Sequence, residues 1–402
     1  MVKKFIKNIL GRTKIKEEVI YINILDILRG AEGDDLTGLE YVQMTGDKFR
    51  TSTRGIDSPQ VQLLQDYEKI SDAVFKPDYF INTSYYKNAF ESICYLGDYF
   101  PAAKRPEDVV KVAERFVYSY LERVDLSKYD NRGHNKYEES IIVRPIIGSK
   151  CFQIISGNHR VASAFMKGKK NIEAIVRKNE ATHTYFTDLI SKVIWDEGTA
   201  LYQPINLPEL NHLPLIRKCQ DRFERMINYL NEEKVIINNK SLIDIGSYYG
   251  WFVNQFTKKG VKAFGLERDF SACKVAVELN GLPDDIFINK PLEEFVLNDN
   301  KQYDIILFLS VLHHFSLGKS FMSDVFVLKK LAERTKSFMF FDTGEEHETM
   351  FGNALKGWNE QTIKEFILLN TDFKEVISLG RDSDNVGKHL NDYRRMLFVL
   401  KK

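Results

Sequence analysis

The stretch that most constrains the fold is 241–250, SLIDIGSYYG, where a short apolar strand runs into a loop bounded by Gly246 and Gly250. A predicted helix, GWFVNQFTKKG, follows at once. Glycine lets backbone approach a ligand closely, and a helix N-terminus offers free N–H groups. In an open parallel sheet such a loop lies at the carboxyl edge, where ligands bind. We therefore expect a ligand-binding strand–loop–helix unit.

Strand and helix alternate through the rest of the C-terminal half. A helix is predicted over 215–233, and the later segments are the strands VKAFGLE, YDIILFLSVL and SFMFFD, the helix FSACKVAVELNG, and a closing hairpin of FKEVISLGR and YRRMLFVLK. This alternation indicates a doubly wound parallel sheet with helices on both faces. We expect a Rossmann-like α/β domain over 219–402.

The N-terminal half has a mixed pattern. Predicted helices are SPQVQLLQDYEKI, TSYYKNAFESICYLGDYF, PEDVVKVAERFVYSYLERV and HRVASAFMKGKK, and predicted strands are IIVRPII, CFQIIS and IEAIVRK. This pattern predicts an α+β domain over 1–200. Pro204, Pro208 and Pro214 interrupt helical continuation, so we place a linker at 201–218.

Composition narrows the class of protein. With 402 residues, two or three domains are expected, and 57 basic against 56 acidic residues give no global reason to expect a nucleic-acid partner. The four cysteines form no CxxC pair, which fits a reducing cytoplasm without a zinc site. Residues 1–16 place apolar side chains at helical spacing among lysines, which predicts either contact with an anionic membrane surface or a packed terminal helix.

An acidic residue follows the next predicted strand. Glu267 offers a carboxylate suited to a ribose diol, and the glycine loop has neither the GxGxxG spacing of dinucleotide folds nor the Gly-Lys-Ser/Thr of a phosphate loop. The residues therefore predict a nucleoside cofactor.

Four motifs in order, DIGSYYG, GLERD, PLEEF and YDIILFLSVLHHF, resemble those of class I S-adenosylmethionine-dependent methyltransferases over about residues 220–402. The resemblance implies S-adenosylmethionine as the cofactor. Its implied contacts are Asp244, Gly246 and Gly250 around the methionine moiety, Glu267 at the ribose, Leu292 and Glu293 at the adenine, Ser310 in the reaction cleft, and Ser247, Tyr248 and Arg268 as further cofactor-binding residues. Tyr248 is a departure, because many members carry glycine there.

His313 and His314 follow the fourth predicted strand directly. An unperturbed imidazole has a pKa near working pH, so either histidine could take a proton from an acceptor hydroxyl. The alternative is that they cap the cofactor pocket.

Three further groups lie in the last segments. Asp342, Glu345, Glu346 and His347 predict either a metal site or a solvated acidic loop, and Trp358, placed at the start of a helix, either stacks on an acceptor or packs. The tail resembles that of methyltransferases acting on surface polysaccharides. That resemblance implies that Arg381, Arg394 and Arg395 contact an anionic or sugar acceptor, the alternative being surface arginines without a partner.

The N-terminal half carries its own motif, IISGNHRVASAF. Gly157 provides a turn before a helix, and Asn158, His159 and Arg160 place donors at its N-terminus, as in an anion or phosphate site. Residues 135–178 resemble the ParB/sulfiredoxin superfamily, which implies a nucleotide here. Asn158 stands where sulfiredoxin needs cysteine, so thiol chemistry is not expected. The alternative is that these residues cap the helix and pack.

Together these features predict a cytoplasmic O-methyltransferase acting on a sugar, glycan or phosphorylated small molecule, as in polysaccharide biosynthesis. One alternative is a bifunctional kinase-methyltransferase, in which the N-terminal domain phosphorylates the acceptor. A second is a nucleic-acid-directed methyltransferase or binding module.

Overall fold

The computed structural model describes residues 17–31, 36–100, 103–122, 140–193, 200–386 and 394–402. The chain forms two compact units, which we call unit 1 (residues up to 188 together with 206–212) and unit 2 (189–205 and 213–402). The expected helix over 1–16 lies outside the described residues. Within the described part of the chain, no helix combines the length and apolar character needed to cross a bilayer.

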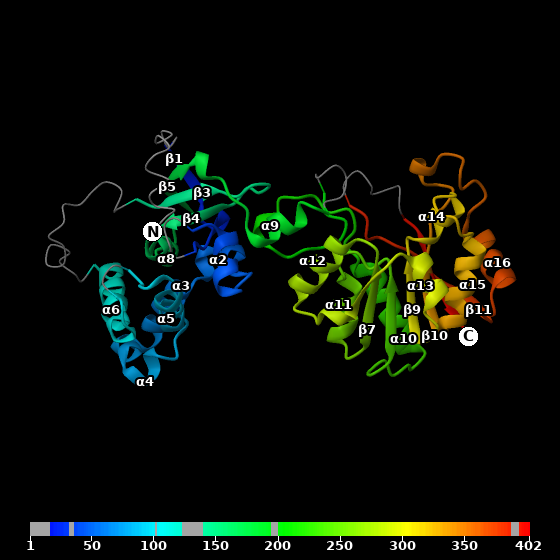
Figure 1. Ribbon diagram of the computed structural model, residues 1–402, viewed down its shortest axis with the longest axis horizontal. Helices are drawn as coiled ribbons and strands as arrows, with labels where there is room; N and C mark the ends of the chain where they lie inside the picture. The colour runs from blue at the N-terminus through cyan, green and yellow to red at the C-terminus, as the bar shows by residue number, and fades with distance from the viewer. Residues whose placement is uncertain (1–16, 32–35, 101–102, 123–139, 194–199, 387–393) are drawn as a thin grey trace. The chain divides into compact units, whose positions relative to one another are not determined.

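Unit 2 is built on a seven-stranded sheet in the order β11-β12-β10-β9-β6-β7-β8 (Figure 1). Its strands are β6 (Ser241–Ile245), β7 (Lys262–Glu267), β8 (Phe287–Asn289), β9 (Tyr303–Leu309), β10 (Thr335–Asp342), β11 (Glu375–Arg381) and β12 (Met396–Lys401). All neighbours from β10 to β8 are parallel, whereas β12 is antiparallel to both β10 and β11. The expected α/β sheet and closing hairpin are therefore confirmed.

Helices cover both faces of this sheet. They are α10 (Gln220–Glu232), α11 (Trp251–Lys258), α12 (Phe270–Asn280), α13 (Leu292–Asn298), α14 (Leu312–Ser316), α15 (Asp324–Arg334) and α16 (Glu360–Asn370). Successive strand residues point to opposite faces, so Leu307 packs with α10, α11 and α12, and Phe308 packs with α13, α14, α15 and α16. The strand order reverses between β6 and β9, which is where an open α/β sheet binds its ligand.

Local signals set the helix ends in unit 2, with two corrections to the expected bounds. The Asp269 side chain accepts the N–H groups at the start of α12, and left-handed Gly281 ends that helix. Asn359 caps α16 in a capping box, so Trp358 precedes the helix rather than beginning it. The helix expected over 215–233 begins only at Gln220.

Unit 1 contains a five-stranded mixed sheet in the order β1-β5-β3-β4-β2. Its strands are β1 (Glu17–Asn23), β2 (Ile27–Leu28), β3 (Ile142–Pro145), β4 (Phe152–Ser156) and β5 (Asn171–Arg177). Its principal helices are α2 (Gly38–Thr45), α3 (Pro59–Ile70), α4 (Pro77–Phe80), α5 (Ser84–Leu96), α6 (Val109–Tyr120) and α8 (Asn158–Met166). The short 3₁₀ helix η8 (Pro208–Leu210) falls within the stretch expected as a linker and belongs to unit 1.

Candidate functional site

The loop after β6 has a backbone that only glycine accommodates at two positions. Gly246 has φ +74°, and a Cβ there would lie 2.9 Å from a methyl carbon of Val311. Gly250 has φ +69°, and its Cβ would lie 2.6 Å from the Phe287 ring. Because both the left-handed backbone and the close contacts exclude larger side chains, the loop is held closely against its neighbours at the point where the strand order reverses.

Asp244 at the end of β6 is almost fully buried, and its Oδ2 atom accepts no hydrogen bond from the described residues. Burial raises its pKa to about 7, the nearby Glu267 charge adds to this, and Arg222 opposes it. The Ser247 hydroxyl is also buried without a hydrogen-bond partner among the described residues. Buried polar atoms in proteins are normally satisfied, so these two atoms indicate a place for a bound molecule or water that donates hydrogen bonds.

Glu267 ends β7, the strand beside β6. It is 9% exposed, and burial raises the pKa of its carboxyl. One oxygen accepts the Tyr248 N–H at 3.1 Å, and the other accepts the Asp269 N–H at 2.9 Å. These bonds fix the orientation of the carboxylate, whose remaining lone pairs can accept hydrogen bonds from a ligand diol.

The side chain of Tyr248 leaves the loop. Tyr248 has φ +50°, and its hydroxyl donates to the carbonyl of Val193, as does that of Tyr249 at 2.7 Å. The ring of Tyr202 lies edge-on, with centroids 5.7 Å apart. A tyrosine can replace glycine here because its side chain contacts Val193 and Tyr202, while its N–H still binds Glu267.

The remaining expected cofactor residues lie beyond β7 and β8. Arg268 follows β7 and is exposed, and Leu292 is buried in the core at the start of α13. Glu293 accepts a hydrogen bond from the Ser320 hydroxyl at 2.6 Å.

Ser310, directly after β9, has φ +61° and is held by Asp342 at the end of β10. Its N–H and hydroxyl both donate to Asp342 Oδ1, at 2.8 and 2.9 Å. Arg222 contacts the other Asp342 oxygen at 3.1 Å. Burial acts to raise the Asp342 pKa, but the charges of Arg222, Arg217 and Arg395 outweigh it and keep the pKa below its usual value.

His313 does not have the unperturbed pKa that was expected of a general base. It is 4% exposed, and burial, followed by the positive charge of Arg395, lowers its pKa. Its Nδ1 accepts the Gly344 N–H at 3.2 Å, so the neutral ring carries its proton on Nε2. His314 is exposed, with its ring centroid 4.4 Å from that of His313.

The acidic loop after β10 is held by ion pairs and is only partly exposed. Glu345 is buried and pairs with Arg381 at 3.1 and 2.8 Å, and Glu348 pairs through both oxygens with Arg395 at 2.7 Å each. No group of three metal-binding side chains occurs among the described residues. Burial contradicts the solvated-loop interpretation for Asp342 and Glu345, whereas Glu346 and His347 are exposed.

The C-terminal arginines differ from one another. Arg395 is 2% exposed, so the surface alternative is wrong for it, whereas Arg394 is exposed. Arg222, which no sequence motif indicated, forms ion pairs with Asp342 and Asp384. The sequence feature that could have indicated Arg222 is its position four residues before Met226, which places it on the apolar face of α10.

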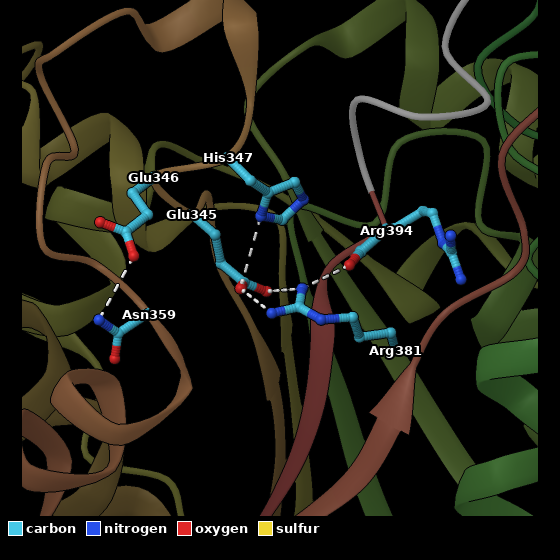
Figure 2. Close-up of a pocket in the computed structure, with 6 residues that line it drawn as sticks. All are labelled: Glu345, Glu346, His347, Asn359, Arg381 and Arg394. Carbon is cyan, nitrogen blue, oxygen red and sulfur yellow. Dashed lines mark hydrogen bonds and ion pairs between the residues drawn. The ribbon is translucent and has the colours of Figure 1, made fainter.

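An open pocket of about 440 Å³ lies at the same edge of the sheet, at the carboxyl ends of β10 and β11 (Figure 2). It is lined by residues whose side chains end in polar or charged groups: Glu345, Glu346, His347, Asn359, Arg381 and Arg394. Trp358 precedes the lining residue Asn359 in the chain. Its ring packs on that of Phe366, with centroids 5.4 Å apart.

The motif of unit 1 is embedded in side chains. Gly157 has φ +118°, Asn158 begins α8, and Arg160 donates to the Ser156 hydroxyl at 3.3 Å. The His159 ring bonds the Tyr85 hydroxyl at 2.8 Å. Its centroid lies 4.7 Å from that of Phe100 and 4.3 Å from that of Phe116. This placement favours a packing role for His159.

No protein-family model and no curated protein matches the chain. Solved structures with partial similarity include the bifunctional kinase-methyltransferase WbdD, at 18% identity and TM-score 0.43, over 54% of this chain and 45% of that one. Another is magnesium protoporphyrin IX methyltransferase (ChlM) from Synechocystis PCC 6803 with bound SAM, at 13% identity and TM-score 0.33, over 46% of this chain and 79% of that one. The match thus spans less than half the length of WbdD.

Proposed function

We propose that unit 2 is an S-adenosylmethionine-dependent methyltransferase that methylates a hydroxyl group. The observation that supports this best is the set of polar groups around the glycine loop. The buried Asp244 oxygen without a partner and the oriented Glu267 carboxylate lie at the ends of adjacent strands, next to the point where the strand order reverses. These hydrogen-bond acceptors suit a ligand that carries a diol and a cationic group.

The residues present fit this cofactor. Gly246 and Gly250 allow its close approach, and Glu267 would accept the ribose hydroxyls. Asp244 would face the methionine moiety, whose ammonium group favours an ionised carboxylate. When bound, the cofactor supplies a methyl group on a sulfonium.

The protein would contribute mainly by positioning. Holding the two reactants in line within the site removes much of the entropy cost of bringing them together for the reaction. His313 would act as a cap, because its Nδ1 is already used by Gly344 and its lowered pKa makes it a poor proton acceptor. We assign no phosphoryl transfer to unit 1, where His159 is packed among aromatic rings.

Calorimetry with S-adenosylhomocysteine tests the proposal. We expect Glu267→Ala to weaken binding at least about tenfold, because hydrogen bonds to a charged acceptor are lost. Glu365→Ala, an exposed position on α16, is the matched control and should bind like the wild type. If the wild-type chain binds neither S-adenosylhomocysteine nor S-adenosylmethionine, the proposed function is wrong. If Glu267→Ala binds normally, the ribose assignment is wrong.

A further inference from the structure

The pocket shown in Figure 2 is built from the segments that follow β10 and β11 and precede β12. Glu345 comes from the loop after β10, Arg381 ends β11, and Arg394 precedes β12. Gly344, next to Glu345, donates its N–H to His313 at 3.2 Å. A molecule bound in this pocket would therefore lie at the same edge of the sheet as the proposed methyl donor.

The pocket walls offer hydrogen-bond donors and acceptors side by side. Arg381 is held by Glu345 and by the Arg394 carbonyl at 2.8 Å, which leaves other N–H groups of its guanidinium for a ligand. Glu346 accepts the Gly357 N–H at 2.9 Å and contacts the Asn359 amide at 3.4 Å. The exposed Arg394 and His347 complete the wall.

The charges in the pocket balance. The lining includes two glutamates and two arginines, so the formal charges of these four side chains cancel. A phosphate accepts hydrogen bonds and carries negative charge, so the exposed Glu346 carboxylate would repel it. A sugar hydroxyl both donates and accepts, which matches a wall of carboxylates, guanidinium groups and a carboxamide.

We propose that this pocket binds a neutral sugar ring of the methyl acceptor. The inference rests on the proposed methyltransferase function and narrows its acceptor to an uncharged glycosyl group instead of a phosphorylated one.

The test uses the full chain saturated with S-adenosylhomocysteine and saturation-transfer NMR. The probes are methyl glycosides of the common hexoses, 6-deoxyhexoses and N-acetylhexosamines, with inorganic phosphate as the competitor. We expect at least one glycoside to bind and phosphate not to displace it. Glu346→Ala and Arg394→Ala should each weaken that binding about tenfold, as for a lost hydrogen bond to a charged group, while S-adenosylhomocysteine still binds.

The matched control is a second polar pocket, which Lys329, Glu333 and Asp372 line at the amino-terminal ends of β10 and β11. Lys329→Ala and Glu333→Ala should leave glycoside binding unchanged. Three outcomes would each overturn the sugar inference and leave the methyltransferase proposal standing. They are displacement of the glycoside by phosphate, glycoside binding by the Glu346 and Arg394 variants that equals that of the wild type, and no glycoside binding by a chain that binds S-adenosylhomocysteine. Failure to bind S-adenosylhomocysteine would instead overturn the function on which the inference rests.

Discussion

At the scale of single residues, Asp244 has the clearest consequence for stability. Its pKa in the folded chain is about 7, chiefly because of burial, whereas an unfolded aspartate titrates at about 3.9. Folding therefore favours the protonated form. The stability that this residue contributes is fully present below about pH 4 and is lost as the pH rises to about 7.

Asp244→Asn should remove this pH dependence, because the carboxamide has a similar shape and does not titrate. Between pH 5 and pH 8 we expect the wild-type chain to lose about 3 kcal/mol more stability than the variant. Urea unfolding followed by tryptophan fluorescence measures this, since Trp251 and Trp358 belong to unit 2. Equal pH slopes in the two proteins would contradict the assignment.

The variant His313→Asn distinguishes a capping role of His313 from a role as general base. The Asn carboxamide oxygen can take the place of Nδ1 and accept the Gly344 N–H, but it cannot take up a proton at working pH. We expect kcat within about tenfold of the wild type, against the 100-fold or greater loss expected for a missing base. The measurement is methyl transfer from labelled S-adenosylmethionine to the acceptor. His313→Ala, which leaves that N–H without its partner, should lower Tm more than His313→Asn does.

At the scale of elements, buried ion pairs connect α10 to the end of β10 and to the segment after β11. Arg222 on α10 contacts both Asp342 at the end of β10 and Asp384, each at 3.1 Å. Asp342 in turn fixes Ser310 in its left-handed conformation. One helix thus helps to set the loop after β9 that borders the proposed site.

Arg222→Met should be strongly destabilising, because it leaves two buried carboxylates without their main cation. Breaking a buried pair in this way costs about 3–5 kcal/mol. Arg225→Met on the same helix is the matched control. Arg225→Met loses a one-third exposed ion pair with Asp221 and a hydrogen bond to the Leu379 carbonyl, so it should cost about 1–2 kcal/mol, less than Arg222→Met. Chemical unfolding followed by fluorescence measures the loss of stability in each variant. A loss for Arg222→Met no greater than that for Arg225→Met would show that the Arg222 network contributes little.

At the scale of the whole molecule, the sequence predicts unit 2 better than unit 1. In unit 2 the central strands β6, β9 and β10 are largely apolar segments between helices, so local pattern and final position agree, whereas the three-residue strand β8 was not predicted. In unit 1, β1 was missed although its sequence contains the apolar run VIYI (19–22), and β2 has only two residues, too few to form a pattern. Tyr21 and Val19 are 76% and 55% exposed because β1 lies at the edge of the sheet.

The same contrast holds for the candidate site. The positions of Gly246, Gly250 and Glu267 follow from the order of motif and strand, and they could be read from the sequence. The pairing of Arg222 with Asp342 could not, because it joins residues 120 positions apart in the chain. The packing of His159 against Phe116 likewise depends on how the helices of unit 1 meet.

Unit 1 also depends on a segment beyond its main span. Glu209 on η8 is fully buried, and the hydroxyls of Ser52 and Thr184 both donate to one of its carboxylate oxygens. The Ser149 hydroxyl donates to the Glu209 carbonyl at 2.7 Å. Burial raises the pKa of the Glu209 carboxyl, which favours its protonated form.

Glu209→Ala should therefore destabilise unit 1 by about 2–4 kcal/mol, because it opens a cavity and leaves two buried hydroxyls without an acceptor. Glu209→Gln keeps the acceptor and resembles the protonated acid, so it should cost much less, and it should flatten the loss of stability above about pH 4.3 that a raised pKa produces. Hydrogen exchange in β3 and β4 measures both effects. S-adenosylhomocysteine affinity should be unchanged, because its proposed site lies in unit 2. Equal protection in Glu209→Ala and wild type would show that unit 1 does not need this residue, and a loss of cofactor affinity would show that the two units are energetically coupled.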